Sequence, residues 1–167
     1  MLKLNSILLI MNKMNFTKIN VIAKAFNELT NNELYDLLAL RTNVFVVEQN
    51  CPYPELDYKD QVAIHVLIYH KNTLIAVSRI LPPNISYPEV SIGRVATAKE
   101  FRGNKIGYFL MENNMAHVLK LYGKVPVRIS AQSYLQKFYE HFLFKFTGKS
   151  YLEDGIPHLE MLYIPKD

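Results

Sequence analysis

Residues 91–115 combine small and basic residues in a pattern that could bind phosphate. The stretch, SIGRVATAKEFRGNKIGYFLMENNM, reads as a strand, a turn around Arg102 and Gly103, and the beginning of a helix. Such a turn leaves backbone N–H groups unpaired at the positive end of the helix dipole, where phosphate oxygens bind well. Arg102 and Lys105 would add full positive charges, and Gly103 and Gly107 would allow a close backbone approach. Purely structural turns also show this pattern, so both interpretations stay open at this point.

Gly93 lies inside the preceding strand, where a glycine often marks a β-bulge or a close backbone approach. A bulged strand that leads into an anion-binding turn would present strand amides and phosphate-binding amides along one line. A ligand with an amide-containing arm and a pyrophosphate would match both. The turn lacks the G-K-[ST] of a Walker A loop and the three-glycine spacing of a dinucleotide-binding fingerprint.

Residues 48–60 carry four carboxylates against a single lysine, in a chain of net charge +4. Acidic clusters are usually solvated surface. This one follows a predicted helix whose Arg41 falls on the apolar face, where a guanidinium must find a carboxylate or bind something. A second acidic group, Glu153 and Asp154, lies near the C-terminus. If both groups border one cleft, a ligand bound there is cationic, and the candidate residues for binding it are Arg41, Asp57, Asp60, His65 and His158. Glu48 is a candidate base or ligand clamp, and it could equally pair with Arg41.

Hydrophobic periodicity predicts the elements that must position these residues. Strands are expected at 63–69, 73–81, 90–96, 125–131 and 158–164, with a tight turn at 71–72 between the first two. One helix begins at a capping box, Thr30 to Glu33, and extends to Phe45; a second spans about 104–121. A second capping box, Ser133 to Gln136, opens a short third helix. Strand, turn, helix and strand follow one another across 90–131, which predicts a mixed α/β domain with one central sheet.

The composition of the chain limits which partners, locations and metal sites are expected. The chain has 167 residues, half of them hydrophobic and a fifth charged, which indicates one globular domain. Its charge is spread without a basic run, so we expect no nucleic-acid partner. The lone Cys51 fits a reducing, cytoplasmic location, and the five histidines lack the spacing of a metal site. Residues 1–14 are predicted to be a flexible or dispensable extension before a domain at 15–167. The apolar patch at 7–11 is too short to span a membrane, and could instead be an edge strand.

The ordered motifs together resemble the GCN5-related N-acetyltransferase (GNAT) superfamily. Residues 91–115 resemble its coenzyme A motif, whose turn reads Q/R-x-x-G-x-G/A: Arg102 and Gly107 match, and Lys105 stands where the first glycine is expected. SYLQKFYEHFLFKF, residues 133–146, resembles a later motif of the family. RTNVFVVEQNCPYPELDYKD and EDGIPHLEM, residues 41–60 and 153–161, resemble the ElaA-type branch. The resemblance covers roughly residues 30–167.

This resemblance implies a GNAT-like mixed α/β (α+β) sheet of about six or seven strands, flanked by about four helices, with a β-bulge near Gly93. It implies an acetyl-CoA-dependent N-acetyltransferase acting on a small amine, with no metal. The backbone amide near Val95 would meet the thioester carbonyl, and Tyr139 would protonate the departing thiolate. The implied coenzyme A contacts are Arg94, Val95, Ala96, Arg102, Gly103, Asn104, Lys105, Ile106 and Gly107.

Several alternatives stay open. Tyr139 could be a packing aromatic at the boundary of its helix. LALRTNVFVVEQ also resembles acyl-homoserine-lactone synthases, which take acyl groups from a carrier protein. A coenzyme-A-binding module without turnover would show the same turn. The oligomeric state is open as well, with a homodimer as one alternative.

Overall fold

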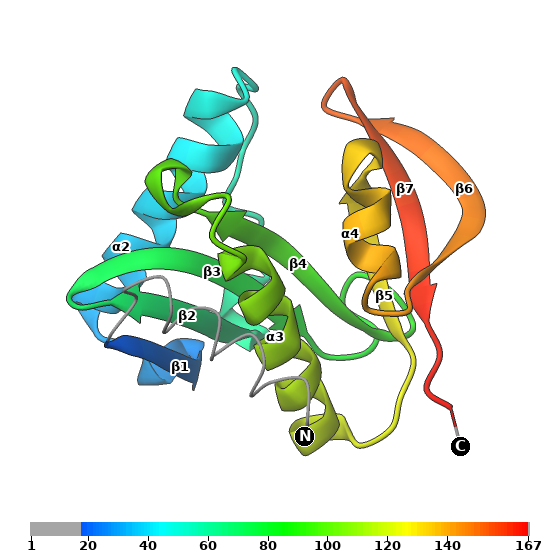
Figure 1. Ribbon diagram of the computed structural model, residues 1–167, viewed down its shortest axis with the longest axis horizontal. Helices are drawn as coiled ribbons and strands as arrows, with labels where there is room; N and C mark the ends of the chain where they lie inside the picture. The colour runs from blue at the N-terminus through cyan, green and yellow to red at the C-terminus, as the bar shows by residue number, and fades with distance from the viewer. Residues whose placement is uncertain (1–17, 167) are drawn as a thin grey trace.

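The computed structural model describes residues 18–166, and Figure 1 shows their arrangement. The expectations for residues 1–14 lie outside this range. The helices are α2 (Asn31–Thr42), α3 (Ile106–Tyr122) and α4 (Gln136–Glu140), with a π-helical turn at Asn43–Glu48 directly after α2. The strands are β1 (Ile19–Ala25), β2 (Ile64–His70), β3 (Thr73–Leu81), β4 (Val90–Thr97), β5 (Val127–Gln132), β6 (Lys145–Glu153) and β7 (Ile156–Tyr163). Short 3₁₀ turns lie at Phe26–Glu28, Asp60–Val62, Lys99–Phe101 and Ser133–Leu135.

The predicted mixed α/β fold with one central sheet is confirmed. The seven strands form one sheet in the order β1-β2-β3-β4-β5-β7-β6. Neighbouring strands are antiparallel except β4 and β5, which run parallel. Their parallel pairing is limited to Val90 with Val127 and Ser91 with Arg128. Beyond these pairs the two strands diverge, as Figure 1 shows between the green and yellow parts of the sheet.

Arg128 links β4, β5 and β7 at the end where β4 and β5 pair. Its guanidinium donates hydrogen bonds of 2.6 and 2.8 Å to Glu89, the residue before β4, and one of 2.6 Å to Glu160 on β7. One arginine thus joins three segments, and charge-assisted bonds of this kind are the stronger ones in proteins. The strands are held together at this end and left apart at the other.

Helices cover both faces of the sheet. Alternate side chains of a strand point to opposite faces, so Val66 and Ile68 of β2 pack in the core cluster that contains α3, whereas Leu67 packs with Leu37 of α2. Both clusters are apolar, which is why β2 and β3 read as near-continuous hydrophobic runs. In Figure 1, α3 and α4 lie on the side facing the viewer and α2 lies behind the sheet.

The five predicted strands and the two-residue turn at 71–72 are present within two residues of their expected bounds. The capping box at Thr30 forms, with Glu33 N–H donating to the threonine hydroxyl and the Glu33 carboxylate accepting from Thr30 N–H. The predicted box at Ser133 does not form: residues 133–135 make a 3₁₀ turn, and the Gln136 side chain donates to Glu140 instead. The edge strands β1 and β6 escaped prediction because they lack a strong alternating pattern.

Candidate functional site

A cavity of about 1040 Å³ lies where β4 and β5 diverge. It is bounded on one side by β4 and the turn into α3, and on the other by β5, α4 and the β6–β7 turn. Of the predicted site residues, its lining includes Glu48, Asp57, Arg94, Val95, Ala96, Arg102, Gly103, Lys105, Ile106, Gly107, Tyr139 and His158. The lining does not include Arg41, Asp60, His65 or Asn104. The structure therefore brings most of the predicted coenzyme residues and both predicted catalytic residues to one cavity.

The turn before α3 has the geometry of an anion cradle. Gly103 adopts a φ of 79°, in the left-handed region that favours glycine, and Lys105 adopts φ 59° and ψ 14° there as well. Lys105 is the N-cap of α3, and among residues 18–166 no side chain caps that helix. The N–H groups of its first turn are thus left for a ligand. Asn104 does not line the cavity; its amide donates at 3.2 Å to the carbonyls of Phe101 and Arg102 and so stabilises the turn.

The predicted β-bulge is present one residue beyond Gly93. Arg79 of β3 pairs with Gly93 and Val77 pairs with Ala96, so Ser78 alone faces two residues of β4. Those two residues are Arg94 and Val95, and it is Arg94, with φ 52°, that adopts the left-handed conformation. A bulge leaves backbone groups of the strand without ladder partners. Here they lie along the wall of the cavity.

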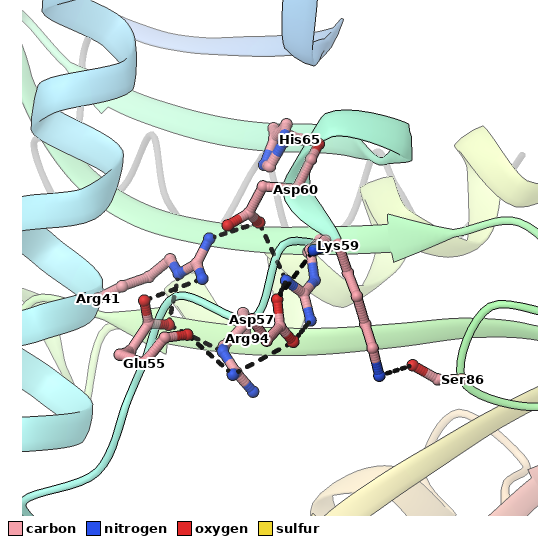
Figure 2. Close-up of polar contacts among 9 residues, drawn as sticks. Arg41, Glu55, Asp57, Lys59, Asp60, His65, Ser86 and Arg94 are labelled. Atoms are coloured by element: carbon pink, nitrogen blue, oxygen red, sulfur yellow. Dashed lines mark hydrogen bonds and ion pairs between the residues drawn. The ribbon is translucent and has the colours of Figure 1, made fainter.

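A network of three arginines and three carboxylates holds the bulge and the 49–60 loop together (Figure 2). Glu55 accepts two hydrogen bonds from Arg41, of 2.7 and 2.9 Å, and one of 2.8 Å from Arg94. Asp57 accepts two from Arg79, of 2.6 and 2.7 Å, and Asp60 accepts one each from Arg41 and Arg79. Removing one partner from a buried ion pair typically costs about 3–5 kcal/mol, so this network fixes the loop conformation strongly.

Electrostatics within the network keep Asp57 and Asp60 ionised. Burial works to raise the pKa of Asp57, but the hydrogen bonds and charge of Arg79, with the charge of Arg94, outweigh it and hold that pKa well below the usual value. Burial likewise opposes ionisation of Asp60, and Arg41 and Arg79 lower its pKa. The net charge of the six groups is zero.

The network changes the interpretation of the acidic stretch. Arg41 is fully buried and finds the carboxylates that its place on an apolar face required. Asp60 is 5% exposed, and the fully buried His65 hydrogen-bonds through Nε2 to the Asp60 carbonyl oxygen at 3.1 Å. Burial lowers the pKa of His65. Arg41, Asp60 and His65 thus stabilise the loop from behind the cavity wall, and of the four carboxylates of the acidic stretch only Glu48 and Asp57 line the cavity.

Glu48 forms an ion pair with the predicted phosphate-binding arginine rather than with Arg41. Arg102 donates to the two carboxylate oxygens of Glu48 at 2.8 and 3.1 Å, and its Nε donates to the Thr97 carbonyl at 2.9 Å. The π-helical turn at Asn43–Glu48 brings Glu48 to this position. Both side chains are partly exposed, so a competing anion can reach the pair.

Tyr139 is 6% exposed and packs within the core cluster on the α3 side of the sheet, yet it also lines the cavity. Its ring contacts Phe138 and Phe144 edge-on, at centroid distances of 4.9 and 6.1 Å. Burial raises the pKa of its hydroxyl, so the phenol stays protonated at neutral pH, the state that a proton donor requires. Packing and acid catalysis are therefore compatible roles for this residue.

The opposite wall of the cavity is polar and comes from β5, β6 and β7. Tyr151 donates to the Ser130 hydroxyl at 2.6 Å, and Ser130 donates to Glu153 at 3.0 Å. His158 lies beside them, between Gln132 on β5 and Tyr151 on β6 in the strand register. Sequence reasoning missed Ser130 and Gln132, although VRISAQ alternates apolar and polar residues and so marks one polar face. It also missed Tyr87, which lines the same cavity and lies in an irregular loop without a pattern.

Within 18–166, no helix has the length and apolarity needed to cross a bilayer. In the same range, no three histidine, cysteine or acidic side chains are grouped as a metal site would need.

Comparison with known proteins agrees with this geometry. Residues 36–164 match the family described as acetyltransferase (GNAT) domain. Protein ElaA of Escherichia coli K12 is 41% identical over 137 residues, covering 81% of this chain and 90% of ElaA. The crystal structure of Escherichia coli ElaA matches with a TM-score of 0.82 and 38% identity, covering 87% of this chain and 99% of that one. An acyl-CoA N-acyltransferase from Pseudomonas aeruginosa matches with a TM-score of 0.83 and 40% identity, over the same shares of the two chains.

A more distant structure bears on the alternative chemistry. The CoA-dependent acyl-homoserine lactone synthase BjaI matches with a TM-score of 0.73 and 15% identity, covering 87% of this chain and 82% of that one. At this identity the likeness concerns the fold alone. The family match over residues 36–164 and the 41% identity to ElaA show that this chain is an acyltransferase of the GNAT family, in its ElaA-type branch.

Proposed function

We propose that this chain transfers the acetyl group of acetyl-CoA to a small, cationic amine by direct attack of the amine on the thioester. The observation that carries the proposal is the cavity at the divergence of β4 and β5. It joins the anion cradle, the bulged strand and a polar sheet face, which are the surroundings that a pyrophosphate, a thioester and an amine respectively need.

The residues around the turn fit coenzyme A. The uncapped first turn of α3, with Arg102 and Lys105 beside it, would hold the pyrophosphate. The bulge at Arg94 and Val95 would present backbone N–H groups to the amide arm and to the carbonyl oxygen of the thioester, where negative charge develops during transfer. When bound, acetyl-CoA supplies an acyl group already activated as a thioester.

Tyr139 is the residue that we assign to proton donation. Its hydroxyl is kept protonated by burial and its ring is fixed by Phe138 and Phe144. A fixed donor near the departing sulfur would neutralise the thiolate as it forms. Glu48 is better placed to pair with Arg102 at the pyrophosphate end than to accept a proton from the amine.

The preference for a cationic amine rests on Glu153 and Asp154, at the mouth of the cavity. Among the described residues, neither carboxylate forms an ion pair with an arginine or lysine, in contrast to Glu48 and Asp57. Unpaired carboxylates at a cavity mouth attract cations and raise their local concentration. The acceptor class is therefore assigned from residues 153–154 rather than from the acidic stretch at 48–60.

A thiol-release assay with acetyl-CoA tests the proposal directly. Polyamines, aminosugars and lysyl peptides would be supplied separately, and the product would be identified by mass spectrometry. We expect release of free coenzyme A and an acetylated product with at least one cationic class. Thermal stabilisation of the protein by acetyl-CoA, without release of free coenzyme A in the presence of any of these amines, would favour a non-catalytic binding module. Turnover with an acyl-carrier donor alone would favour the lactone-synthase chemistry.

A double variant sharpens the assignment of the acceptor. Exchanging Glu153 for Gln and Asp154 for Asn removes two negative charges at the mouth with little change of shape. We expect the KM for the cationic amine to rise about threefold to tenfold, with an unchanged dissociation constant for acetyl-CoA. An unchanged KM would show that the amine is recognised elsewhere.

A further inference from the structure

His158 lies on the polar face of the sheet, across from the side that holds α3 and α4. On β7, Leu159 and Met161 pack in the apolar core cluster, so His158 and Glu160 point to the opposite face. On β5, Ala131 and Ile129 pack in that same cluster, which places Gln132 and Ser130 on the face of His158. Tyr139 and His158 therefore line one cavity from opposite faces of the sheet.

The imidazole of His158 is held in one orientation. Its Nδ1 lies 2.8 Å from the carbonyl oxygen of Ile156. A carbonyl oxygen only accepts hydrogen bonds, so the ring must carry its proton on Nδ1, and Nε2 of the neutral ring keeps its lone pair. Tyr151 stacks on the ring, with centroids 6.2 Å apart and planes 17° from parallel, which restrains its rotation.

Four other ionisable groups that line the cavity are less suited to accept a proton. Glu48 is bound at two oxygens by Arg102, and Asp57 is bound at two oxygens by Arg79. Glu153 already accepts a hydrogen bond from Ser130. Tyr139 is held in its protonated form, which makes it a donor.

The groups that surround His158 would support a positive charge on the ring. Tyr151 and Glu153 face it from β6, and Gln132 and Ser130 from β5. Along β7, Glu160 is two residues away and already paired with Arg128. Glu153 and the nearby Asp154 are left to balance a proton taken up by the ring.

We propose that His158 is the general base that deprotonates the acceptor amine, an assignment that rests on the proposed acetyl transfer. The proton moves from the ammonium nitrogen to Nε2, and the freed lone pair of the nitrogen forms the new C–N bond. The C–S bond of the thioester breaks, its electron pair stays on sulfur, and the sulfur takes a proton from the Tyr139 hydroxyl. The acylated nitrogen, still positively charged, releases its second proton to solvent, and the Tyr139 phenolate regains a proton from solvent. Base and acid thus act from opposite faces of the sheet on one reacting carbonyl.

The test combines a variant with a measurement on the unmodified protein. His158→Asn keeps an amide N–H near the position of Nδ1, which can still donate to Ile156, but it removes the acceptor at Nε2. We expect kcat/KM for the amine to fall by about 100- to 1,000-fold, because general base catalysis contributes factors of this size. The rise of kcat/KM with pH that a general base produces should disappear, and the dissociation constant of acetyl-CoA should stay within threefold. His117→Asn, on α3 and outside the cavity lining, is the matched control and should keep both values.

Nitrogen-15 NMR of the wild-type protein at pH 8 reports the tautomer of His158 without any need for turnover. A protonated Nδ1 and a pyridine-like Nε2 are expected. A proton on Nε2 would overturn the proposal, as would a His158→Asn variant with activity within threefold of wild type and an unchanged pH profile. If the wild type acetylates no amine at all, the proposed function fails, whereas the NMR result still decides whether Nε2 is free to accept a proton.

Discussion

Lys105 occupies the position at which the GNAT motif is expected to have glycine. Its backbone conformation allows the effect of Lys105→Gly on stability to be estimated. Its φ of 59° lies in the left-handed region, where a residue with a Cβ loses roughly 1–2 kcal/mol. Glycine avoids that strain but loses about 0.5–1 kcal/mol more backbone entropy on folding. The difference predicts that Lys105→Gly is more stable than wild type by about 0.5–1 kcal/mol. For a domain of this size, that corresponds to a rise in Tm of about 1–4 °C.

The same substitution removes one cation from the proposed phosphate site. Lys105 is exposed, and an exposed ion pair contributes about 0.2–1 kcal/mol. Since about 1.4 kcal/mol corresponds to a tenfold change, the affinity for coenzyme A should fall only about 1.5- to 5-fold. Lys105→Ala is the matched control, because it removes the charge but keeps the Cβ and the strained backbone. Its affinity for coenzyme A should fall by the same factor, but its Tm should not rise.

Isothermal titration calorimetry with coenzyme A and thermal unfolding followed by circular dichroism measure the two effects separately. A loss of affinity beyond tenfold in Lys105→Gly would show that Lys105 is a principal ligand of the phosphates. A glycine variant that melts below the alanine variant would refute the strain argument, because both lack the charge and differ only at Cβ.

Three further results are expected. Glu48→Gln releases Arg102 from its ion pair and should tighten coenzyme A binding, measured by calorimetry, by up to about fivefold. Because Arg79 and Arg94 hold the pKa of folded Asp57 below its ordinary value of 3.8, its contribution to stability is complete above about pH 5 and is lost as the pH falls. Urea unfolding of Asp57→Asn should therefore show a weaker loss of stability between pH 5 and 3 than wild type. Tyr139→Phe keeps the ring packing and should lower kcat about 100-fold with unchanged acetyl-CoA affinity.

Each of these three predictions has an outcome that would contradict it. Weaker coenzyme binding in Glu48→Gln would mean that Glu48 orients Arg102 for the phosphates rather than competing with them. Equal acid sensitivity of Asp57→Asn and wild type would place the titrating group elsewhere. Full kcat in Tyr139→Phe would leave that tyrosine as a packing residue, and Phe138→Leu serves there as a control for simple disturbance of the aromatic cluster.

Local sequence determined much of this protein. The central strands and the long helix α3 follow from hydrophobic runs and periodicity, because burial on both faces of the sheet demands continuous apolar stretches. The turn that we propose binds phosphate could be recognised as a candidate because strand, glycine, basic residues and helix are adjacent in the chain. Thr30 also acts as predicted, since a capping box involves residues only three positions apart.

What the tertiary structure alone decided is how charges distant in the sequence combine. Counted along the chain, residues 48–60 carry an excess of negative charge, yet Arg41, Arg79 and Arg94 neutralise it from a helix and two strands. Ion pairs between residues 14 to 39 positions apart depend on strand order and register, which no local pattern encodes. The polar face around His158 likewise requires β5, β6 and β7 to lie side by side. For that reason the end of the cavity that we propose binds the acceptor became visible only in the folded chain.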